Sequence, residues 1–203
     1  ALGPKVACRM KRLRPDWEVT VMEQQEEIAC SVCGIPYYIS GDVAEIQGLM
    51  TASFQMVRSR EFFEDAKDVR IETKTRALAL DREANEVRVR NVETGAEGKL
   101  SYDRLVLATG QRPKSLNVPG ADLPDVISAT TLRQAEAVKS RISQGGVAKA
   151  VIIGASPRGL EMTAAVSDLW GVETTVGESD TQGLPGLLDS TVALMVQQEL
   201  QNR

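Results

Sequence analysis

Hydrophobic and polar positions near the start of the chain follow two different periods, each of which predicts a different element. Apolar residues recur at near-helical spacing through residues 3–13, so we predict a helix that ends before Pro15. Residues 18–23 alternate instead and predict a short strand that closes on Glu23. A helix followed by a strand with an acid at its end is typical of part of a dinucleotide-binding unit. The strand that would precede this helix is not in the sequence, and we expect Gly3 to be the last glycine of a phosphate-binding turn.

The middle of the chain carries patterns typical of strands. Thr94-Gly95 supplies a turn, so we expect a small antiparallel element from Ala77 to Tyr102. Residues 105–108 are wholly apolar and predict a short strand covered on both faces. The other predicted strands are residues 69–73, 75–80 and 86–92, with residues 99–102 leading into a further strand.

The second half of the chain repeats the strand–turn–helix–strand plan. Residues 113–124 are punctuated by proline and glycine and predict a linker between two lobes. The expected fold is therefore an α/β protein of two Rossmann-like domains, each with a parallel sheet, spanning residues 1–113 and 114–203. After the linker we predict helices at residues 130–142, capped by Thr130 or Thr131, at 160–169 and at 191–200, and strands at residues 150–154 and 172–176.

Composition narrows the classes of function. The chain has 203 residues, of which 42% are hydrophobic, and a net charge of -4. This charge and the lack of a basic stripe argue against a nucleic-acid partner. The sequence has no apolar run of about eighteen residues, so we expect no membrane span. No secretory signal opens the chain, and three cysteines are typical of a cytoplasmic protein rather than of a secreted disulfide scaffold. Histidine, the commonest zinc ligand and general base, is absent, so we expect no metal.

The strongest candidate for chemistry is the pair Cys30 and Cys33. A Cys-x-x-Cys spacing is typical of redox or metal sites. Zinc needs more ligands, and the chain offers only one further cysteine and no histidine. The spacing alone leaves two interpretations open: a redox site, or two small apolar residues in a core.

The residues around Cys33 carry a resemblance to a known family. Residues 31–41, Ser-Val-Cys-Gly-Ile-Pro-Tyr-Tyr-Ile-Ser-Gly, resemble the active-site segment of the pyridine-nucleotide disulfide oxidoreductases, in the branch of coenzyme A disulfide reductases and NADH oxidases. The resemblance implies that Cys33 is a single redox-active cysteine. Cys30 stands where the branch commonly has an aromatic residue, which implies a structural substitution, and a Cys30–Cys33 disulfide stays open.

The opening helix is similar to the first helix of the same family. The resemblance implies that the helix start, at Gly3 and Pro4, faces the pyrophosphate of FAD. It also implies that Arg9 and Arg12 reach the phosphates of coenzyme A. The two arginines are three residues apart and share a helix face, and guanidinium groups suit phosphate oxygens. The alternative from the residues alone is a solvated basic face.

Further residues match the FAD-binding pattern of the family. Glu23 stands where the family has the acid that binds the adenosine ribose of FAD. Residues 105–110 resemble a second FAD fingerprint, in which small residues let the backbone approach the cofactor. The positions assigned to FAD on this basis also include Ala77, Ala108, Thr109 and Gly110.

A second glycine-rich turn predicts the nicotinamide nucleotide site. Gly154, Ser156 and Gly159 follow a strand and open a helix, as in a Gly-x-Gly-x-x-Gly motif with serine at the middle glycine. That serine either crowds the pyrophosphate or caps the helix. Glu161 after the turn is also similar to the family. Glu178, beyond the next strand, favours the unphosphorylated ribose of NADH over that of NADPH.

The resemblance implies an enzyme that passes a hydride from NADH (or NADPH) through FAD to Cys33, held as a mixed disulfide with coenzyme A. Its partner would be a small disulfide or thiol. The family works as a homodimer in which the partner subunit supplies the acid–base group. Three alternatives stay open: an NADH oxidase or peroxidase in which Cys33 cycles through a sulfenic acid, a sulfur or persulfide reductase, and a non-catalytic nucleotide-binding remnant.

Overall fold

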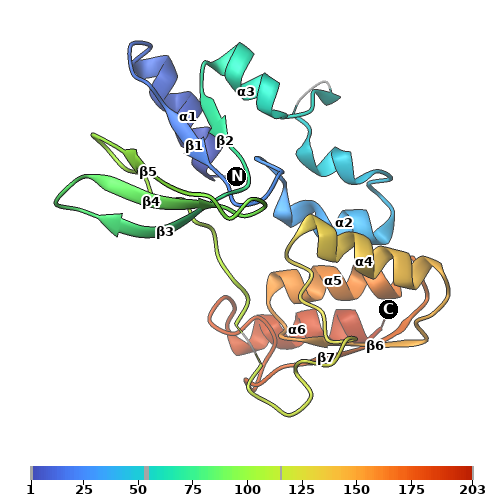
Figure 1. The fold of residues 1–203 in the computed structure, drawn as a ribbon. Coiled ribbons are helices and arrows are strands. Elements are labelled where there is room, and N and C mark those ends of the chain that lie inside the picture. The colour runs from blue at the N-terminus through green and yellow to red at the C-terminus, as the bar shows by residue number, and fades with distance from the viewer. Residues whose placement is uncertain (1, 53–54, 115, 203) are drawn as a thin grey trace. The chain divides into compact units, whose positions relative to one another are not determined.

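The computed structural model describes residues 2–52, 55–114 and 116–202 and divides the chain into two compact units (Figure 1). The first unit consists of Ala1–Ser31 and Met50–Lys114, and the second of Val32–Leu49 and Ser115–Arg203. The main division falls in the predicted linker. The assignment of Val32–Leu49, which carries Cys33, to the second unit was not expected from the sequence. The nucleotide that each half binds stays a prediction.

A parallel pair of strands and two helices build the base of the first unit. Strands β1 and β2 pair in parallel, with Val21 opposite Ile71. Phe63, in the helix at residues 60–67, packs with Ala7, in the helix at residues 2–13, and with Ile71 of β2, which is fully buried. Burying such a side chain contributes about 1.5–3 kcal/mol to stability. The elements of this part are α1 (Leu2–Leu13), β1 (Thr20–Met22), α3 (Arg60–Lys67) and β2 (Arg70–Glu72).

Helix α3 was not predicted from the sequence. Its ends are defined by local hydrogen bonds, because the side chain of Ser59 accepts from the N–H of Phe62, and Asp68 closes the helix with a left-handed backbone. The helix has eight residues, which is shorter than the window of about 11–18 residues in which a helical period is recognised, and within it only Phe63 is buried.

The predicted antiparallel element is confirmed as a three-stranded sheet. Its strands are β3 (Thr75–Asp81), β4 (Glu86–Asn91) and β5 (Glu97–Ser101), in that order. The side chains of Asp81 and Asn91 accept backbone N–H groups two and three residues further on, which shapes the turns after β3 and β4.

One predicted strand of the first unit is wrong. Residues 105–108 have no strand assignment, and the side chains of Val106 and Leu107 are 48% and 64% exposed. A strand requires a hydrogen-bonded neighbour. Within the described part of the chain no other segment pairs with these residues, so their apolar pattern alone does not produce a ladder.

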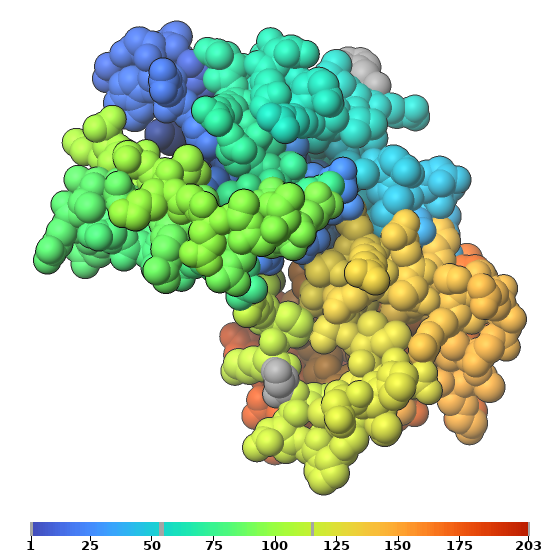
Figure 2. All heavy atoms as spheres, viewed as in Figure 1, coloured from blue at the N-terminus to red at the C-terminus, as the bar shows by residue number. Residues whose placement is uncertain are grey.

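The second unit contains the other parallel sheet and its helices, as predicted. Strands β6 and β7 pair in parallel over five residues. Residues 116–128, yellow-green to yellow in Figure 2, are mostly exposed on the visible surface of this unit. The elements are α4 (Leu132–Ser143), β6 (Lys149–Ile153), α5 (Pro157–Ser167), β7 (Glu173–Gly177) and α6 (Ser190–Gln201).

A short helix that the sequence did not predict completes the second unit. The segment after Ser31 forms a 3-10 turn, η1 (Val32–Gly34), then α2 (Ile35–Ser40), and later a second 3-10 turn, η2 (Ile46–Met50). Helix α2 packs against α4 and α5 (Figure 1). Across the described residues, no helix combines the length and apolar character needed to cross a membrane.

Candidate functional site

Cys33 lies in the 3-10 turn that leads directly into α2. Cys33 is exposed, whereas Ile35 and Ile39 of the helix are almost fully buried. Pro36 stands in the first turn of α2, and Gly41 ends the helix with a left-handed backbone. The thiol is therefore accessible on a support fixed by packing, as a nucleophile toward disulfide sulfur requires.

Polar contacts also hold α2 and the loop after it within the second unit. The indole N–H of Trp170 donates to the backbone oxygen of Ile39 at 2.7 Å. The ammonium of Lys139 donates to the backbone oxygen of Ala44 at 3.2 Å and lies 4.0 Å from the ring centroid of Tyr38. These contacts come from α4 and from the turn after α5, so the Cys33 segment is anchored to both parts of the second unit.

Cys30 has a different environment from Cys33. A structural substitution, as the resemblance implies for Cys30, predicts a buried residue, and the structure places Cys30 half-buried instead. Burial raises the pKa of the Cys30 thiol, with Glu23 and Glu27 acting in the same direction. A raised pKa lowers the thiolate fraction and with it the reactivity. All three cysteines are free thiols, so the structure contains no Cys30–Cys33 disulfide.

The start of α1 approaches the end of the segment that was assigned to FAD. A Cβ added to Gly3 would lie 3.4 Å from the Cβ of Ala108. Two residues later, Gly110 has a φ of +72°, which a residue with a side chain rarely adopts. These small residues bring two backbones close together at one place, and this fits the close approach that a dinucleotide needs.

Glu23 directly follows β1 and is fixed by its backbone. Its N–H donates to the oxygen of Glu72, and its own oxygen accepts from Thr75, both at 2.9 Å. The half-buried carboxylate accepts the N–H of Gln25 at 3.1 Å. Glu23 thus stands at the carboxyl end of a parallel strand, where ribose-binding acids of such folds lie. Ala77 lies exposed on β3.

The second glycine-rich turn has the predicted position at the start of α5. A Cβ on Gly159 would lie 1.9 Å from the backbone oxygen of Gly154, so only glycine fits there. Ser156 is the N-cap of α5 and accepts the N–H of Gly159 at 3.3 Å, with Pro157 in the first turn. The capping interpretation of Ser156 is confirmed. Glu161 is exposed on the same helix.

Glu178 directly follows β7 and contacts the same glycine-rich turn. Its carboxylate accepts the N–H of Ala155 at 2.7 Å, and also those of Ser179 and Asp180. These hydrogen bonds, the one from Ala155 first, hold the pKa of Glu178 below its usual value. The charge is therefore present above this lowered pKa and is lost as the pH falls through it. Sequence reasoning placed Glu178 near the nucleotide but did not predict its contact with the turn.

Replacing Ser156 tests the cap directly. We expect Ser156→Ala to lower the free energy of unfolding by about 0.5–2 kcal/mol, because the N–H of Gly159 loses its acceptor, and Ser156→Gly to lower it by only a few tenths. We expect Ser156→Thr, which keeps a hydroxyl, to restore the cap. Denaturant titration measures the stabilities. NADH affinity, measured by calorimetry, should not rise in Ser156→Gly, and a tighter complex would mean that the serine crowds the pyrophosphate.

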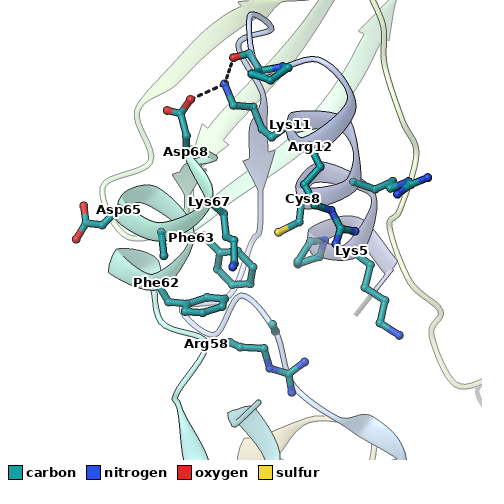
Figure 3. Close-up of a pocket in the computed structure, with 15 residues that line it drawn as sticks. Lys5, Cys8, Lys11, Arg12, Arg58, Phe62, Phe63, Asp65, Lys67 and Asp68 are labelled. Carbon is teal, nitrogen blue, oxygen red and sulfur yellow. Dashed lines mark hydrogen bonds and ion pairs between the residues drawn. The ribbon is translucent and has the colours of Figure 1, made fainter. Parts of the chain in front are cut away.

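A cavity of about 770 Å³ lies between α1 and α3 in the first unit (Figure 3). Arg9 and Arg12 both line it, together with four further cations and two carboxylates. The family resemblance pointed to the two arginines, which share a helix face, but sequence reasoning missed the opposite wall, which comes from residues about fifty positions away. The charged lining residues are Lys5, Arg9, Lys11, Arg12, Arg58, Asp65, Lys67 and Asp68.

The charges of this cavity are only partly neutralised. Lys11 pairs with Asp68 at 2.5 Å (Figure 3), and it also donates to the backbone oxygens of Pro15 and Trp17. For Lys5, Arg9 and Arg12 the described residues provide no ion pair. The wall formed by α1 is therefore electropositive, although the chain as a whole is negative.

Comparison with known proteins establishes the family. A family model described as "Pyridine nucleotide-disulphide oxidoreductase" matches residues 3–203. The chain belongs to this family. A relative in Methanocaldococcus jannaschii, named "NADH oxidase", is 30% identical over 99% of this chain and 43% of its own length. The "NAD(P)H sulfur oxidoreductase (CoA-dependent)" of Pyrococcus furiosus is 32% identical over 98% of this chain and 42% of its own length.

Solved structures of this oxidoreductase family support the fold. The NAD-dependent persulfide reductase of A. fulgidus has a TM-score of 0.91 and 33% identity, covering 98% of this chain and 36% of that one. Coenzyme A disulfide reductases of two Staphylococcus species are also among the relatives, at 25–27% identity. The predicted α/β fold with two Rossmann-like units is confirmed. The chain spans less than half the length of the relatives it matches.

Proposed function

We propose that the protein reduces a disulfide or persulfide of coenzyme A with electrons from NADH, and that Cys33 is its redox-active thiol. The observation that carries this proposal is the exposed Cys33 at the start of a buried, anchored helix, in a member of a disulfide oxidoreductase family. Bound FAD would supply the two-electron transfer between nicotinamide and sulfur. The relative in P. furiosus is named as CoA-dependent, which supports the choice of substrate.

The proposed role of Cys33 is nucleophilic attack. Its thiolate attacks one sulfur of coenzyme A disulfide, so that a Cys33–coenzyme A disulfide forms and one coenzyme A thiolate leaves. Two electrons and a proton then return Cys33 to the thiolate and release the second coenzyme A as a thiol. Helix α2 fixes the position of the thiol during both steps, while Cys30, with its raised pKa, takes no part.

The nucleotides have proposed binding residues in both halves. We assign FAD to Gly3, Pro4, Glu23 and Ala77, together with Ala108, Thr109 and Gly110. NADH is assigned to Gly154, Ser156, Gly159, Glu161 and Glu178. The Glu178 carboxylate beside the turn supports NADH over NADPH, because a ribose phosphate would meet a negative charge.

We further propose a cytoplasmic homodimer, with an FAD-binding part up to residue 113 and an NADH-binding part from residue 114.

A second candidate function is an NADH oxidase, since the M. jannaschii relative has that name. In that case Cys33 would cycle through a sulfenic acid and need no nucleotide thiol. The electropositive wall of Lys5, Arg9 and Arg12 supports the coenzyme A substrate over this candidate, because oxygen and peroxide carry no phosphate.

Turnover measurements on the flavin-loaded protein test the proposed function. We expect NADH consumption with coenzyme A disulfide to exceed that with cystine at least about tenfold, because one good charge-assisted phosphate contact already contributes that much. NADH absorbance and the release of free thiols measure the rates. Oxygen uptake that accounts for all NADH consumed would identify an oxidase. A protein that binds the flavin and consumes no NADH with any acceptor would be a non-catalytic relative.

A further inference from the structure

Tyr37 is the exception in a helix that is otherwise buried. Five of the six residues of α2 are buried, whereas Tyr37 is 53% exposed. It lies four positions after Cys33, which is exposed as well. Residues four apart lie on the same face of a helix. A thiol and a phenol therefore reach the surface on one side of this segment.

The backbone between these two residues determines the direction of the tyrosine ring. Gly34, which joins the 3-10 turn to α2, has a φ of -84° and a ψ of -7°, so the chain stays right-handed from Cys33 into the helix. Long side chains in helices point back toward the residues three and four positions earlier. For Tyr37 these residues are Gly34, which has no side chain, and Cys33. We therefore expect the ring to extend past the thiol.

The other polar side chains around α2 already have partners. The hydroxyl of Ser40 donates to the carboxylate of Asp42 at 2.7 Å. The indole of Trp170 and the ammonium of Lys139 donate to backbone oxygens. Within residues 32–49 and the helices packed on them, as far as the structure describes them, the hydroxyl of Tyr37 has no hydrogen-bond partner. It is thus a free donor for a molecule that reaches this segment.

Tyr37 is fixed through its backbone, which leaves its side chain directed outward. Its backbone oxygen accepts the N–H of Val43 at 2.8 Å and the hydroxyl of Ser40 at 3.0 Å. Donors that are held in place stabilise a developing charge without a cost of reorganisation. In an attack on a disulfide the charge develops on the leaving sulfur, which lies about 4 Å or more from the attacking sulfur, because two S–S bonds separate them. A tyrosine side chain is long enough to reach beyond a neighbouring cysteine to that sulfur.

We propose that Tyr37 is a second catalytic residue, which donates a hydrogen bond to the leaving sulfur while Cys33 attacks a disulfide. The bond between Cys33 and the nearer sulfur forms, the S–S bond of the substrate breaks, and its electron pair goes to the leaving sulfur. The phenol keeps its proton and stabilises this thiolate, which solvent protonates after release. The proposal deepens the proposed function and rests on it, since it requires Cys33 as the nucleophile.

Two disulfides with different leaving thiols test this role in the flavin-loaded protein after reduction with NADH. Coenzyme A disulfide releases an alkyl thiolate, whereas dithiobis(nitrobenzoate) releases the thiolate of a more acidic aryl thiol, which leaves without help. We expect Tyr37→Phe to slow release of the first coenzyme A by at least about tenfold, the effect of one hydrogen bond to a charged group. Release of the first aryl thiolate should change by less than about twofold. Rapid mixing measures both rates, and the rates of Cys33→Ser are subtracted as background.

Tyr38→Phe is the matched control, because it removes a hydroxyl from the same helix and keeps the ring that Lys139 contacts. Both disulfides should react with this variant within about twofold of the parent. The role of Tyr37 is refuted if Tyr37→Phe releases coenzyme A as fast as the parent. It is also refuted if the variant slows both disulfides by the same factor, which would indicate a role in packing. A Cys33→Ser variant that releases thiol as fast as the parent overturns the proposed function and this role together.

Discussion

A Cys33→Ser variant of the flavin-loaded protein is expected to lose reduction of coenzyme A disulfide by more than about 10³-fold, because removal of a covalent nucleophile leaves no alternative route. The hydroxyl of serine cannot form the mixed disulfide. The variant should keep its flavin, since no residue assigned to FAD is changed. Release of free coenzyme A thiol measures the activity, and the flavin absorbance of the purified variant measures cofactor retention.

Cys30→Ser is the matched control for this experiment. Cys30 lies three residues away but is half-buried with a raised pKa, so we expect the variant to keep most of the activity. Full turnover in Cys33→Ser would contradict the central proposal. Equal losses in both variants would instead point to a pair of cysteines that work together.

Removing both α1 arginines is the change with the second largest expected effect. Each guanidinium–phosphate contact contributes at least about 1.5 kcal/mol, so the Arg9→Ala/Arg12→Ala variant should bind coenzyme A roughly 100-fold more weakly. Both side chains line the cavity, and neither has an ion pair within the described residues that would have to be broken first. Calorimetry with coenzyme A gives the dissociation constants.

Arg14→Ala provides a control of the same charge near the same helix. Arg14 pairs with Asp16, stacks over Trp17 and does not line the cavity. We expect its loss to leave coenzyme A affinity within about twofold, since Asp16 already pairs with this charge and the exposed side chain does not line the cavity. If the control weakens binding as much as the double variant, general charge rather than specific phosphate contacts binds the ligand.

The sequence predicted the elements whose pattern reflects their own packing. Helix α1, the strands β1 and β6 and the cap at Thr131 follow from local periodicity and local hydrogen bonds. Helix α2 has six residues with a proline in its first turn, too few to produce a helical period. Its stability comes from α4 and α5, which are distant in sequence. The strand predicted at residues 105–108 was wrong for a different reason. An apolar run shows that a segment can be buried, but it does not show whether a neighbouring strand is present to pair with it.

In the candidate site, too, features set by neighbouring residues could be predicted from the sequence, and features set by the tertiary fold could not. Arg9 and Arg12 could be paired from their spacing on one helix, and Cys33 from its neighbours along the chain. Phe62 and Arg58 join those arginines only because α3 folds beside α1. The contact of Glu178 with Ala155 likewise depends on the pairing of β6 and β7, which brings together residues 23 positions apart.

The membership of Val32–Leu49 in the second unit affects how the protein can be divided into fragments. The chain enters the second unit with α2, returns to the first, and re-enters after residue 114. A cut near residue 113 would therefore separate α2 from α4 and α5 and uncover the surfaces of these two helices against which α2 packs. A soluble fragment of the second unit has to include residues 32–49, and joining them ahead of residue 115 by a flexible linker would preserve their packing.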